Sequence, residues 1–339
     1  MAHDFLVKDI ALQAGLSTAT VDRVVNRRGG VRKQTAARVE AAIGELREQE
    51  KASRLTGRMH VFDIVMEAPD RFTRAVRQAF ENQTGAFRPM SLRLRFHFSE
   101  QMRDADLSRL MARIRHRGSD GIVLKAPDTP AIRKAMADMA VDSVPVVTLV
   151  TDLPGSGRLA YAGSDNRVAG ETAAYLIGSR LGEVPAAVLA TLSSNRFRGE
   201  EEREAAFRAM LHARHPHLRV VTISEGFGKD WTTGAQVRAA LADAGDIRAV
   251  YSIGGGNRSI VDAFEAAGRP LPVHVAHDLD EDNLALLRAE KLSYVLHHNL
   301  EADAAQALGA LIDARGAEAK TKRPALSALV IITPFNIPE

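Results

Sequence analysis

Cysteine is absent from this chain of 339 residues. Its absence excludes disulfide bonds, thiol nucleophiles and cysteine-based zinc sites, and it fits a reducing compartment. Long apolar runs are also missing. The first thirty residues contain no signal-peptide core, and no stretch approaches the roughly 20 apolar residues of a membrane span. We therefore expect a soluble, cytoplasmic protein that has no membrane partner.

A large excess of one charge is missing as well. The formal net charge is only +3, from 45 lysines and arginines against 42 aspartates and glutamates. Any contact with nucleic acid must therefore come from local clustering of basic residues. Hydrophobic residues make up 45% of the chain, enough for a large core, and the chain is too long for one typical domain. We expect two or three domains.

Three zones of different composition follow one another along the chain. Residues 1–47 contain short helical patterns and a dense group of basic residues, residues 48–58 are polar, and residues 59–339 alternate between apolar and amphipathic stretches. We interpret the zones as a small helical domain, a linker and a larger domain. The helical patterns of the first zone are Val7–Ala14, Ser17–Asn26 and Lys33–Leu46, separated by Gly15 and by the pair Gly29 and Gly30.

Alternating strands and helices fill the third zone. This pattern predicts an α/β fold with parallel sheets flanked by helices. One sheet of so many strands would be large, so we expect two doubly wound lobes, over about 59–161 with C-terminal returns and over about 162–295. The strand candidates are His60–Met66, Gly121–Lys125, Val144–Val150, Ala186–Leu192, Leu218–Ile223, Ala249–Ile253 and Pro272–Ala276. The helix candidates include Arg71–Glu81, Leu107–Arg117, Asp165–Leu181, Glu200–His212, Trp231–Ala242, Asn257–Ala267 and Leu284–Lys291.

The first zone contains the parts of a helix-turn-helix. Ile10 and Ala14 give the first helix an apolar face, Gly15 permits a tight turn, and Ser17 is placed to cap the second helix. The polar face of that second helix, which includes Arg23, could enter a major groove. A small helical domain with a solvated charged face would show the same pattern.

A resemblance favours the DNA-binding interpretation. Residues 7–46, with Ala14-Gly15, Ser17, Thr20-Val21 and the run 23–26, resemble the headpiece of the LacI/GalR family of transcriptional repressors. The resemblance implies a homodimer that binds a pseudo-palindromic DNA operator, with Thr18, Ala19 and Arg23 reading bases and Ser17, Asn26 and Thr35 on phosphates. The DNA-contacting residues expected on this basis are Ser17, Thr18, Ala19, Thr20, Arg23, Asn26, Thr35, Ala52 and Leu55.

Two features depart from the family pattern. Asp22 occupies a position where family members commonly carry a small hydroxyl residue, so it either faces phosphate or holds Arg23 in a salt bridge. The linker lacks the aromatic-x-Pro-Asn signal that usually opens the family's hinge helix. Ala52 and Leu55 still keep the family spacing, and in relatives such a leucine wedges into the minor groove. A flexible polar tether is the alternative.

The third zone resembles the family's effector-binding domain, which is related to periplasmic sugar-binding proteins. Such domains close two lobes over a small molecule at the carboxyl ends of their strands. We expect Arg203, Trp231 and Asp278 to converge on one ligand, although Arg203 and Asp278 could be a structural ion pair and Trp231 could pack a lobe. The full set expected to bind effector is Phe72, Asp152, Ser164, Arg203, Trp231, Asn257, Asp278 and His298. Phe72 could equally belong to a helical core, and His298 could merely pack.

The sequence lacks the motifs of phosphate-binding loops and of zinc sites. Gly254–Gly256 is followed by no Gly-Lys-Ser/Thr and so does not predict a phosphate loop, and the triplet His212, His215 and His217 lacks zinc-site spacing. We expect no catalytic residue, metal or cofactor. The sequence therefore predicts a repressor whose operator affinity responds to a sugar or polyol. An α/β enzyme or a solute-binding protein that acts on a sugar or phosphosugar is the alternative.

Overall fold

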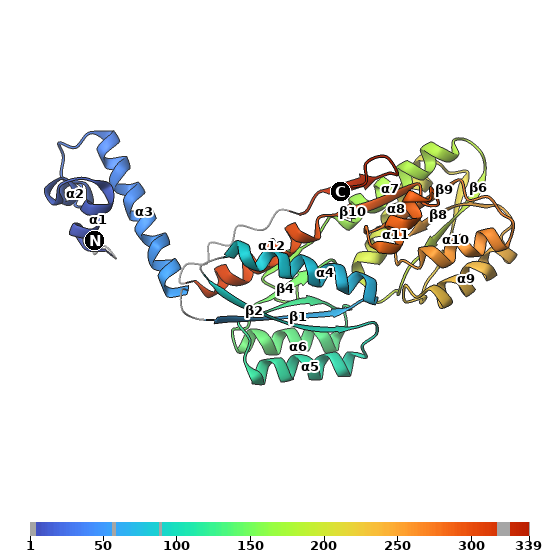
Figure 1. Ribbon diagram of the computed structural model, residues 1–339, viewed down its shortest axis with the longest axis horizontal. Helices are drawn as coiled ribbons and strands as arrows, with labels where there is room; N and C mark the ends of the chain where they lie inside the picture. The colour runs from blue at the N-terminus through green and yellow to red at the C-terminus, as the bar shows by residue number, and fades with distance from the viewer. Residues whose placement is uncertain (1–4, 56–58, 88–89, 317–325, 339) are drawn as a thin grey trace. The chain divides into compact units, whose positions relative to one another are not determined.

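The computed structural model describes residues 5–55, 59–87, 90–316 and 326–338, with the backbone alone for residues 48–55. The chain divides into two compact units, one made mainly of residues 1–60 and a larger one that takes up most of the remainder. Figure 1 shows the helices of the first unit and the mixed helices and strands of the second.

The N-terminal unit packs helices α1 (Val7–Ala14), α2 (Thr18–Val25) and α3 (Lys33–Leu55) around a small core. Its centre is formed by Ile10, Ala11, Val21 and Val39. The turn between the first two helices follows the sequence signals. Gly15 adopts the left-handed conformation at φ 60°, and the Ser17 side chain accepts a hydrogen bond from the Thr20 amide at 3.2 Å. The predicted helix-turn-helix arrangement is confirmed.

The third helix is longer than the sequence pattern predicted. It continues past the expected end at Leu46 to Leu55. Residues 47–55 contain no glycine or proline and consist mostly of arginine, glutamate, glutamine, lysine, alanine and leucine, which favour helix even without an apolar face. Their polar composition therefore does not mark a helix end. The side chains of Ala52 and Leu55 lie outside the described residues.

The first lobe of the larger unit is built on a sheet with strand order β2-β1-β3-β4-β5. Figure 1 shows α4 and α12 on one face of this sheet and α5 and α6 on the other. The strands β1, β3, β4 and β5 are parallel to their neighbours in that series. The strands are β1 (Met59–Glu67), β2 (Ser91–Ser99), β3 (Gly121–Lys125), β4 (Val146–Leu149) and β5 (Ala160–Ala162). The helices are α4 (Asp70–Gln83), the 3-10 turn η1 (Thr84–Phe87), α5 (Asp104–Arg117), α6 (Pro130–Val141) and α12 (Leu300–Arg315).

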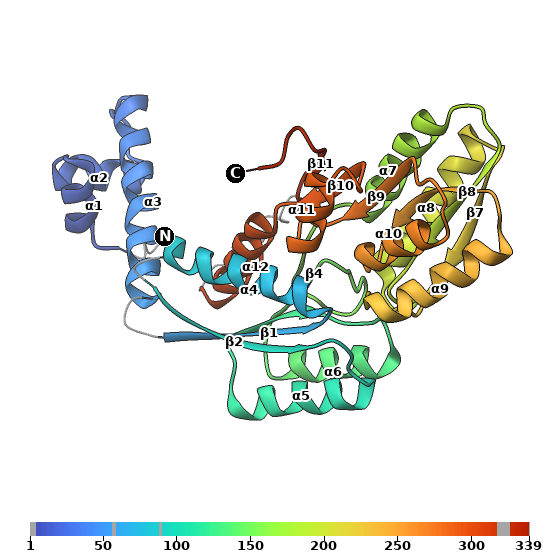
Figure 2. The same cartoon turned by 45° about the vertical axis from the view of Figure 1, so that its right-hand side comes forward.

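The second lobe is built on a sheet with strand order β11-β10-β9-β8-β6-β7, parallel except for the β10–β11 pair. Both faces are covered, as Figure 2 shows. Along β6, Ala186 and Val188 face a core with α7 and α8, whereas Ala187 and Leu189 face a core with α9 and α10. The strands are β6 (Ala186–Thr191), β7 (Leu218–Ile223), β8 (Ile247–Ser252), β9 (Val273–His277), β10 (Tyr294–His298) and β11 (Leu329–Ile332). The helices are α7 (Asn166–Leu181), α8 (Arg198–Arg214), α9 (Asp230–Asp243), α10 (Asn257–Ala266) and α11 (Glu281–Arg288).

The chain passes between the lobes where β5 leads to α7, where β10 leads to α12, and again before β11. Two of these passages are joined. Ser164 forms a parallel bridge with Ser327, and the Ser327 amide donates to the Gly163 carbonyl at 3.0 Å. The expected fold, a helical domain followed along the chain by two parallel-sheet lobes, is therefore confirmed.

A close approach between α7 and α8 depends on glycine. A β-carbon at Gly170 would overlap the carbonyl oxygen of Arg203 and come within 3.0 Å of the Phe207 amide nitrogen. Two backbones this close leave no room for a methyl group, so the absent side chain permits the close packing of α7 against α8. The same close packing holds the helix that carries Arg203, a residue of the site described below.

We predict that Gly170→Ala lowers the unfolding free energy of the larger unit by roughly 1–3 kcal/mol, because the added methyl must displace backbone. Gly309→Ala is the matched control. Gly309 lies inside α12, and a methyl group added there would have nothing within 4 Å. The control change should therefore be neutral or stabilise by up to about 1 kcal/mol. Urea unfolding monitored by circular dichroism measures both, and equal effects of the two changes would contradict this packing argument.

Candidate functional site

A cavity of about 80 Å³ lies where the two lobes meet. Its walls come from the segments that follow β1, β3 and β4 in the first lobe and β6, β8 and β9 in the second. Parallel strands deliver their carboxyl ends to one edge of a sheet, and here the edges of two sheets face each other. The side chains that matter below are Glu67, Arg71, Phe72, Lys125, Phe197, Glu200, Arg203, Phe227, Asp278, Asp280 and Asn283.

Three of the predicted effector residues line this cavity. Phe72 comes from the first turn of α4, Arg203 from α8, and Asp278 from the turn after β9. They are far apart in sequence, and the fold brings them together. The other five predicted residues, Asp152, Ser164, Trp231, Asn257 and His298, do not line the cavity.

Asp278 is held by a buried histidine instead of by Arg203. His298 Nε2 lies 3.1 Å from Asp278, and His298 Nδ1 lies 2.6 Å from Asp303 in α12. Burial alone would lower the pKa of His298, but its hydrogen bonds with the two aspartates outweigh burial and raise the pKa to about 9. Burial would raise the pKa of Asp278, yet the hydrogen bond from His298 holds it well below its usual range. The result is an ionised carboxylate at the cavity wall.

Arg203 presents a buried guanidinium to the same space. The residue is 4% exposed, and its Nε has no hydrogen-bond partner. Within the part of the chain that the structure describes, its guanidinium forms no ion pair, so the predicted alternative of a structural pair with Asp278 is wrong. A buried cation of this kind is available to a ligand.

Lys125 is a cavity residue that the sequence analysis missed. Its Nζ donates to the Glu67 carbonyl at 2.8 Å and lies 3.8 Å from the centre of the Phe197 ring. Burial lowers the pKa of Lys125 to about 8, although Glu200 and Glu67 oppose this shift. The signal was present: Lys125 is the charged end of the apolar strand β3, and Glu67 ends the apolar run Ile64–Met66 of β1.

Two further residues position the walls. Glu200 accepts hydrogen bonds from the Ser193 amide at 2.7 Å and from the Ser193 hydroxyl at 2.5 Å. Asn283 donates to the carbonyls of His277 and Asp278, and it accepts from Asn257 at 2.7 Å. Asn257, predicted to touch effector, therefore acts one step back from the cavity. His298 likewise contacts the cavity residue Asp278 without lining the cavity itself.

Trp231 was expected to bind effector, but it does not line the cavity. It is the second residue of α9, and its side chain is 76% exposed on the outside of the lobe. The buried stripe of α9 runs through Thr233, Gly234, Val237 and Leu241, and Trp231 falls outside it. The aromatic residue that lines the cavity from this region is Phe227, in the loop before the helix.

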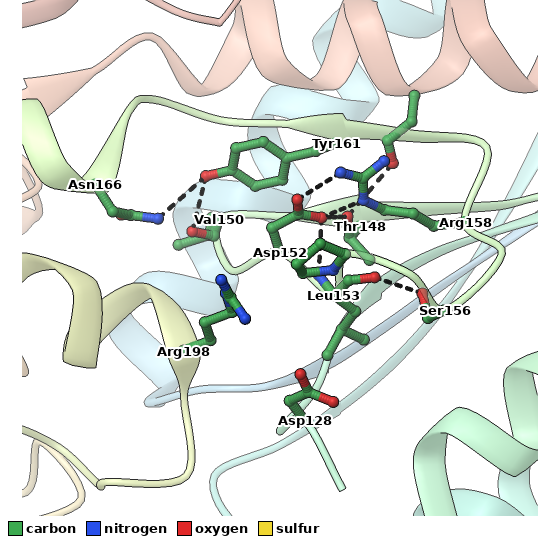
Figure 3. Close-up of polar contacts among 12 residues, drawn as sticks. Asp128, Thr148, Val150, Asp152, Leu153, Ser156, Arg158, Tyr161, Asn166 and Arg198 are labelled. Carbon is green, nitrogen blue, oxygen red and sulfur yellow. Dashed lines mark hydrogen bonds and ion pairs between the residues drawn. The ribbon is translucent and has the colours of Figure 1, made fainter. Parts of the chain in front are cut away.

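Asp152 and Ser164 belong to the connection between the lobes. Asp152 forms an ion pair with Arg158 and accepts from the Thr148 hydroxyl and the Leu153 amide at 2.8 Å each, as Figure 3 shows. The Ser164 carbonyl accepts from the Tyr161 hydroxyl, which also donates to Val150. Both predicted residues thus fix loops behind the cavity.

Ion pairs cross the cavity mouth from one lobe to the other. Arg71 pairs with Asp280 at 2.9 Å, Lys229 pairs with Glu100 at 2.8 Å, and Arg196 pairs with Glu67 at 3.5 Å. Each pair joins one lobe to the other, so together they stabilise the closed arrangement of the cavity. No spacing along the chain indicated these partners.

The N-terminal unit carries a separate candidate surface on α2. Ser17, Thr18, Ala19, Arg23 and Asn26 are exposed there, whereas Thr20 and Thr35 are half-buried. Asp22 pairs with Arg28 at 2.8 Å and accepts from Asn26 at 2.7 Å. The predicted pair between Asp22 and Arg23 is therefore wrong, because Arg28, beyond the helix end, reaches the carboxylate instead.

The described residues show no cluster of three or more histidine or carboxylate side chains suited to a metal. Over the same part of the chain, no helix is both long enough and apolar enough to span a bilayer.

Comparisons with known families match both units. Residues 6–47 match the family model of bacterial regulatory proteins of the lacI family, and residues 64–318 match that of the periplasmic binding protein domain. Among curated protein sequences, none matches this chain. The families and the fold are those of regulators and solute-binding proteins.

Solved structures share the fold of the larger unit. GanP, a glucose-galactose binding protein from Geobacillus stearothermophilus, is 17% identical, with 83% of this chain and 100% of that chain covered and a TM-score of 0.72. A putative LacI transcriptional regulator from Bacteroides fragilis is 12% identical, with 82% and 98% covered and a TM-score of 0.72. A solute-binding protein from Agrobacterium vitis bound with alpha-D-tagatopyranose is 17% identical, with 82% and 95% covered and the same TM-score of 0.72.

The histidine between two aspartates predicts a pH dependence of stability. The folded-state pKa of His298, about 9, lies above its ordinary value of 6.5. Its contribution is thus complete below pH 6.5 and is lost as the pH rises toward 9. Between pH 6.5 and 8 we expect the unfolding free energy to fall by at most about 2 kcal/mol. The window ends at pH 8 because the pKa of Lys125 is about 8, and its shift acts in the opposite sense as the pH rises further. Urea unfolding at several pH values measures the slope, which should flatten in His298→Gln; an unchanged slope would exclude His298 as its source.

Proposed function

The chain belongs to the lacI family of bacterial regulatory proteins, and on this premise we propose that it is a cytoplasmic transcriptional repressor. In this proposal a homodimer binds a pseudo-palindromic DNA operator, and a sugar-like small molecule controls its affinity for DNA. The observation that carries the proposal is that one chain combines an exposed helix-turn-helix surface with a buried polar cavity between two lobes. Neither part requires catalysis.

The exposed face of α2 supports DNA recognition. Arg23 is exposed and forms no ion pair among the described residues, so its guanidinium is available for a bidentate contact with guanine. Thr18 and Ala19 lie near the start of the same helix, where recognition helices commonly meet base edges. Ser17, Asn26 and Thr35 are proposed as phosphate contacts. Because one headpiece buries too little surface for tight selective binding, we propose two headpieces on two half-sites.

The cavity supports a small polyhydroxylated effector. Aromatic rings from Phe72 and Phe227 can pack against the apolar faces of a sugar ring, and Asp278 with Arg203 can accept from and donate to hydroxyl groups. Two of the similar structures are described as a glucose-galactose binding protein and a protein bound with alpha-D-tagatopyranose. A sugar or polyol is therefore the proposed effector class.

Closure of the lobes would couple the two functions. A ligand that contacts both lobes favours the closed arrangement, in which Arg71 and Asp280 already pair across the mouth. If closure changes how the two headpieces of a dimer are presented, then effector binding must change operator affinity, and operator must change effector affinity by the same factor.

We predict that Arg23→Ala weakens binding to the cognate operator by roughly 1–3 kcal/mol and relaxes selectivity at one base position. Arg23→Lys keeps the charge but loses the bidentate geometry, so it should also lose selectivity. Fluorescence anisotropy with operator variants measures both. Equal weakening on every sequence by Arg23→Ala, with affinity restored by Arg23→Lys, would make Arg23 a phosphate contact instead.

A thermal-shift panel of sugars and polyols tests the effector proposal, and any compound that binds must also alter operator affinity. For that compound, we expect Asp278→Asn to weaken binding by roughly 1.5–3 kcal/mol through loss of a charged acceptor. Asparagine tolerates the positive φ of 62° at this position. Calorimetry measures the affinity. Trp231→Ala is the control: its exposed ring should not affect binding, and a large loss there would show that the ligand occupies a different place.

A further inference from the structure

The acidic and the basic residues around the cavity differ in whether they already have a partner. The carboxylates already have partners: Glu67 with Arg196, Glu100 with Lys229, Asp278 with His298, Asp280 with Arg71, and Glu200 with the Ser193 amide and hydroxyl. Two buried carboxylate oxygens among these five have no hydrogen-bond partner of good geometry, Glu67 Oε2 and Asp278 Oδ1, although Asp278 Oδ1 lies 3.1 Å from His298 Nε2. Four of the five carboxylates therefore already have a cationic partner.

The two buried cations of the cavity are not paired in this way. Lys125 is 8% exposed and donates only to a backbone carbonyl and a ring face. Arg203 is 4% exposed, and its Nε lacks an acceptor. Within the described ranges, neither has a carboxylate oxygen within 4 Å of its side-chain nitrogens. Burial lowers the pKa of Lys125 most, the negative charges of Glu200 and Glu67 oppose this shift, and the nearby positive charge of Arg203 adds to it.

Two buried cations that form no ion pair among the described residues are costly. Removing a charge from water is unfavourable unless an opposite charge or strong hydrogen bonds replace the solvent. Hydroxyl groups of a neutral sugar could satisfy single N–H groups but would leave the net charge in place. An anionic group on the ligand would remove both the desolvation cost and the mutual repulsion.

We infer that the effector is a sugar acid, a polyhydroxylated molecule whose carboxylate is neutralised by Lys125 and Arg203. This inference rests on the proposed function, and it narrows the effector class from sugars and polyols in general to acidic ones. Lys125 becomes the residue that distinguishes an acid from its neutral counterpart. The free Oε2 of Glu67 and the carboxylate of Asp278 remain to accept hydroxyl groups.

A carboxylate suits the cavity better than a phosphate. Phosphate sites in α/β folds rely on free backbone amides at strand-to-helix turns. Here three of those amides are already used. The Ser193 amide donates to Glu200, the Gly199 amide to Thr151 Oγ1, and the Gly254 amide to the Thr191 carbonyl. With these amides occupied, the anion is left mainly to the Lys125 and Arg203 side chains, which suits the smaller charge of a carboxylate.

The test is calorimetry on the full-length protein with matched ligand sets: glucose, glucuronate and glucose 6-phosphate; galactose, galacturonate and galactose 6-phosphate; glucitol and gluconate. We expect at least one acid to bind at least tenfold more tightly than its neutral counterpart and than the matched phosphate. Neutral ligands binding as tightly as the acids, or a phosphate binding more tightly, would overturn the inference and leave the proposed effector function standing. Binding of none of these compounds would contradict both.

Substitutions of Lys125 test whether this residue causes the preference for the acid over its neutral counterpart. Lys125→Met keeps the volume and removes the charge, and it should reduce the preference for the acid at least fivefold, with affinity for the neutral counterpart changed less. Lys125→Gln provides a second neutral side chain. Lys291→Met is the control, because Lys291 pairs with Glu265 on an exposed surface away from the cavity. A preference that is unchanged in both Lys125 variants would overturn the role of this lysine and with it the inference.

Discussion

The common direction of the strands is the constraint on which the whole site depends. In both sheets parallel strands end at the junction of the lobes, so residues that follow β1, β3, β4, β6, β8 and β9 become neighbours of the cavity. Glu67, Lys125 and Asp278 are the clearest cases, because each lies at or just after the end of a buried strand. Apolar strand interiors build the two cores, and polar strand ends build the site.

A carboxylate buried at such a junction needs a partner inside the protein. The chain does this with a relay in which Asp278, His298 and Asp303 alternate in charge. Asp278 follows β9 and His298 ends β10 in the second lobe, while Asp303 lies on α12, which packs in the first lobe. The relay therefore connects Asp278, which lines the cavity, with α12, the helix through which the chain returns to the first lobe. A ligand that changes the environment of Asp278 would be felt through His298 at this connection.

Sequence patterns predicted most elements of the fold, for reasons visible in particular segments. The strand Ala186–Leu192 was found because a fully buried parallel strand is a continuous apolar run. The strand Ser91–Ser99 was not predicted, because its alternating arginine and apolar residues are only partly buried at a sheet edge. The third helix was predicted too short, since nothing in residues 47–55 distinguishes a polar linker from an exposed helix.

The sequence by itself determined a helix-turn-helix followed by two parallel-sheet lobes, and it placed Phe72, Arg203 and Asp278 among the candidates for one site. Only the tertiary structure decided the partners. It paired Asp278 with His298 instead of Arg203 and Asp22 with Arg28 instead of Arg23, turned Trp231 outward, and brought Lys125 in. The physical reason is that periodicity and glycine or proline signals fix the backbone locally. The partner of a charge and the direction of a side chain near a helix start depend instead on groups that approach from distant parts of the chain.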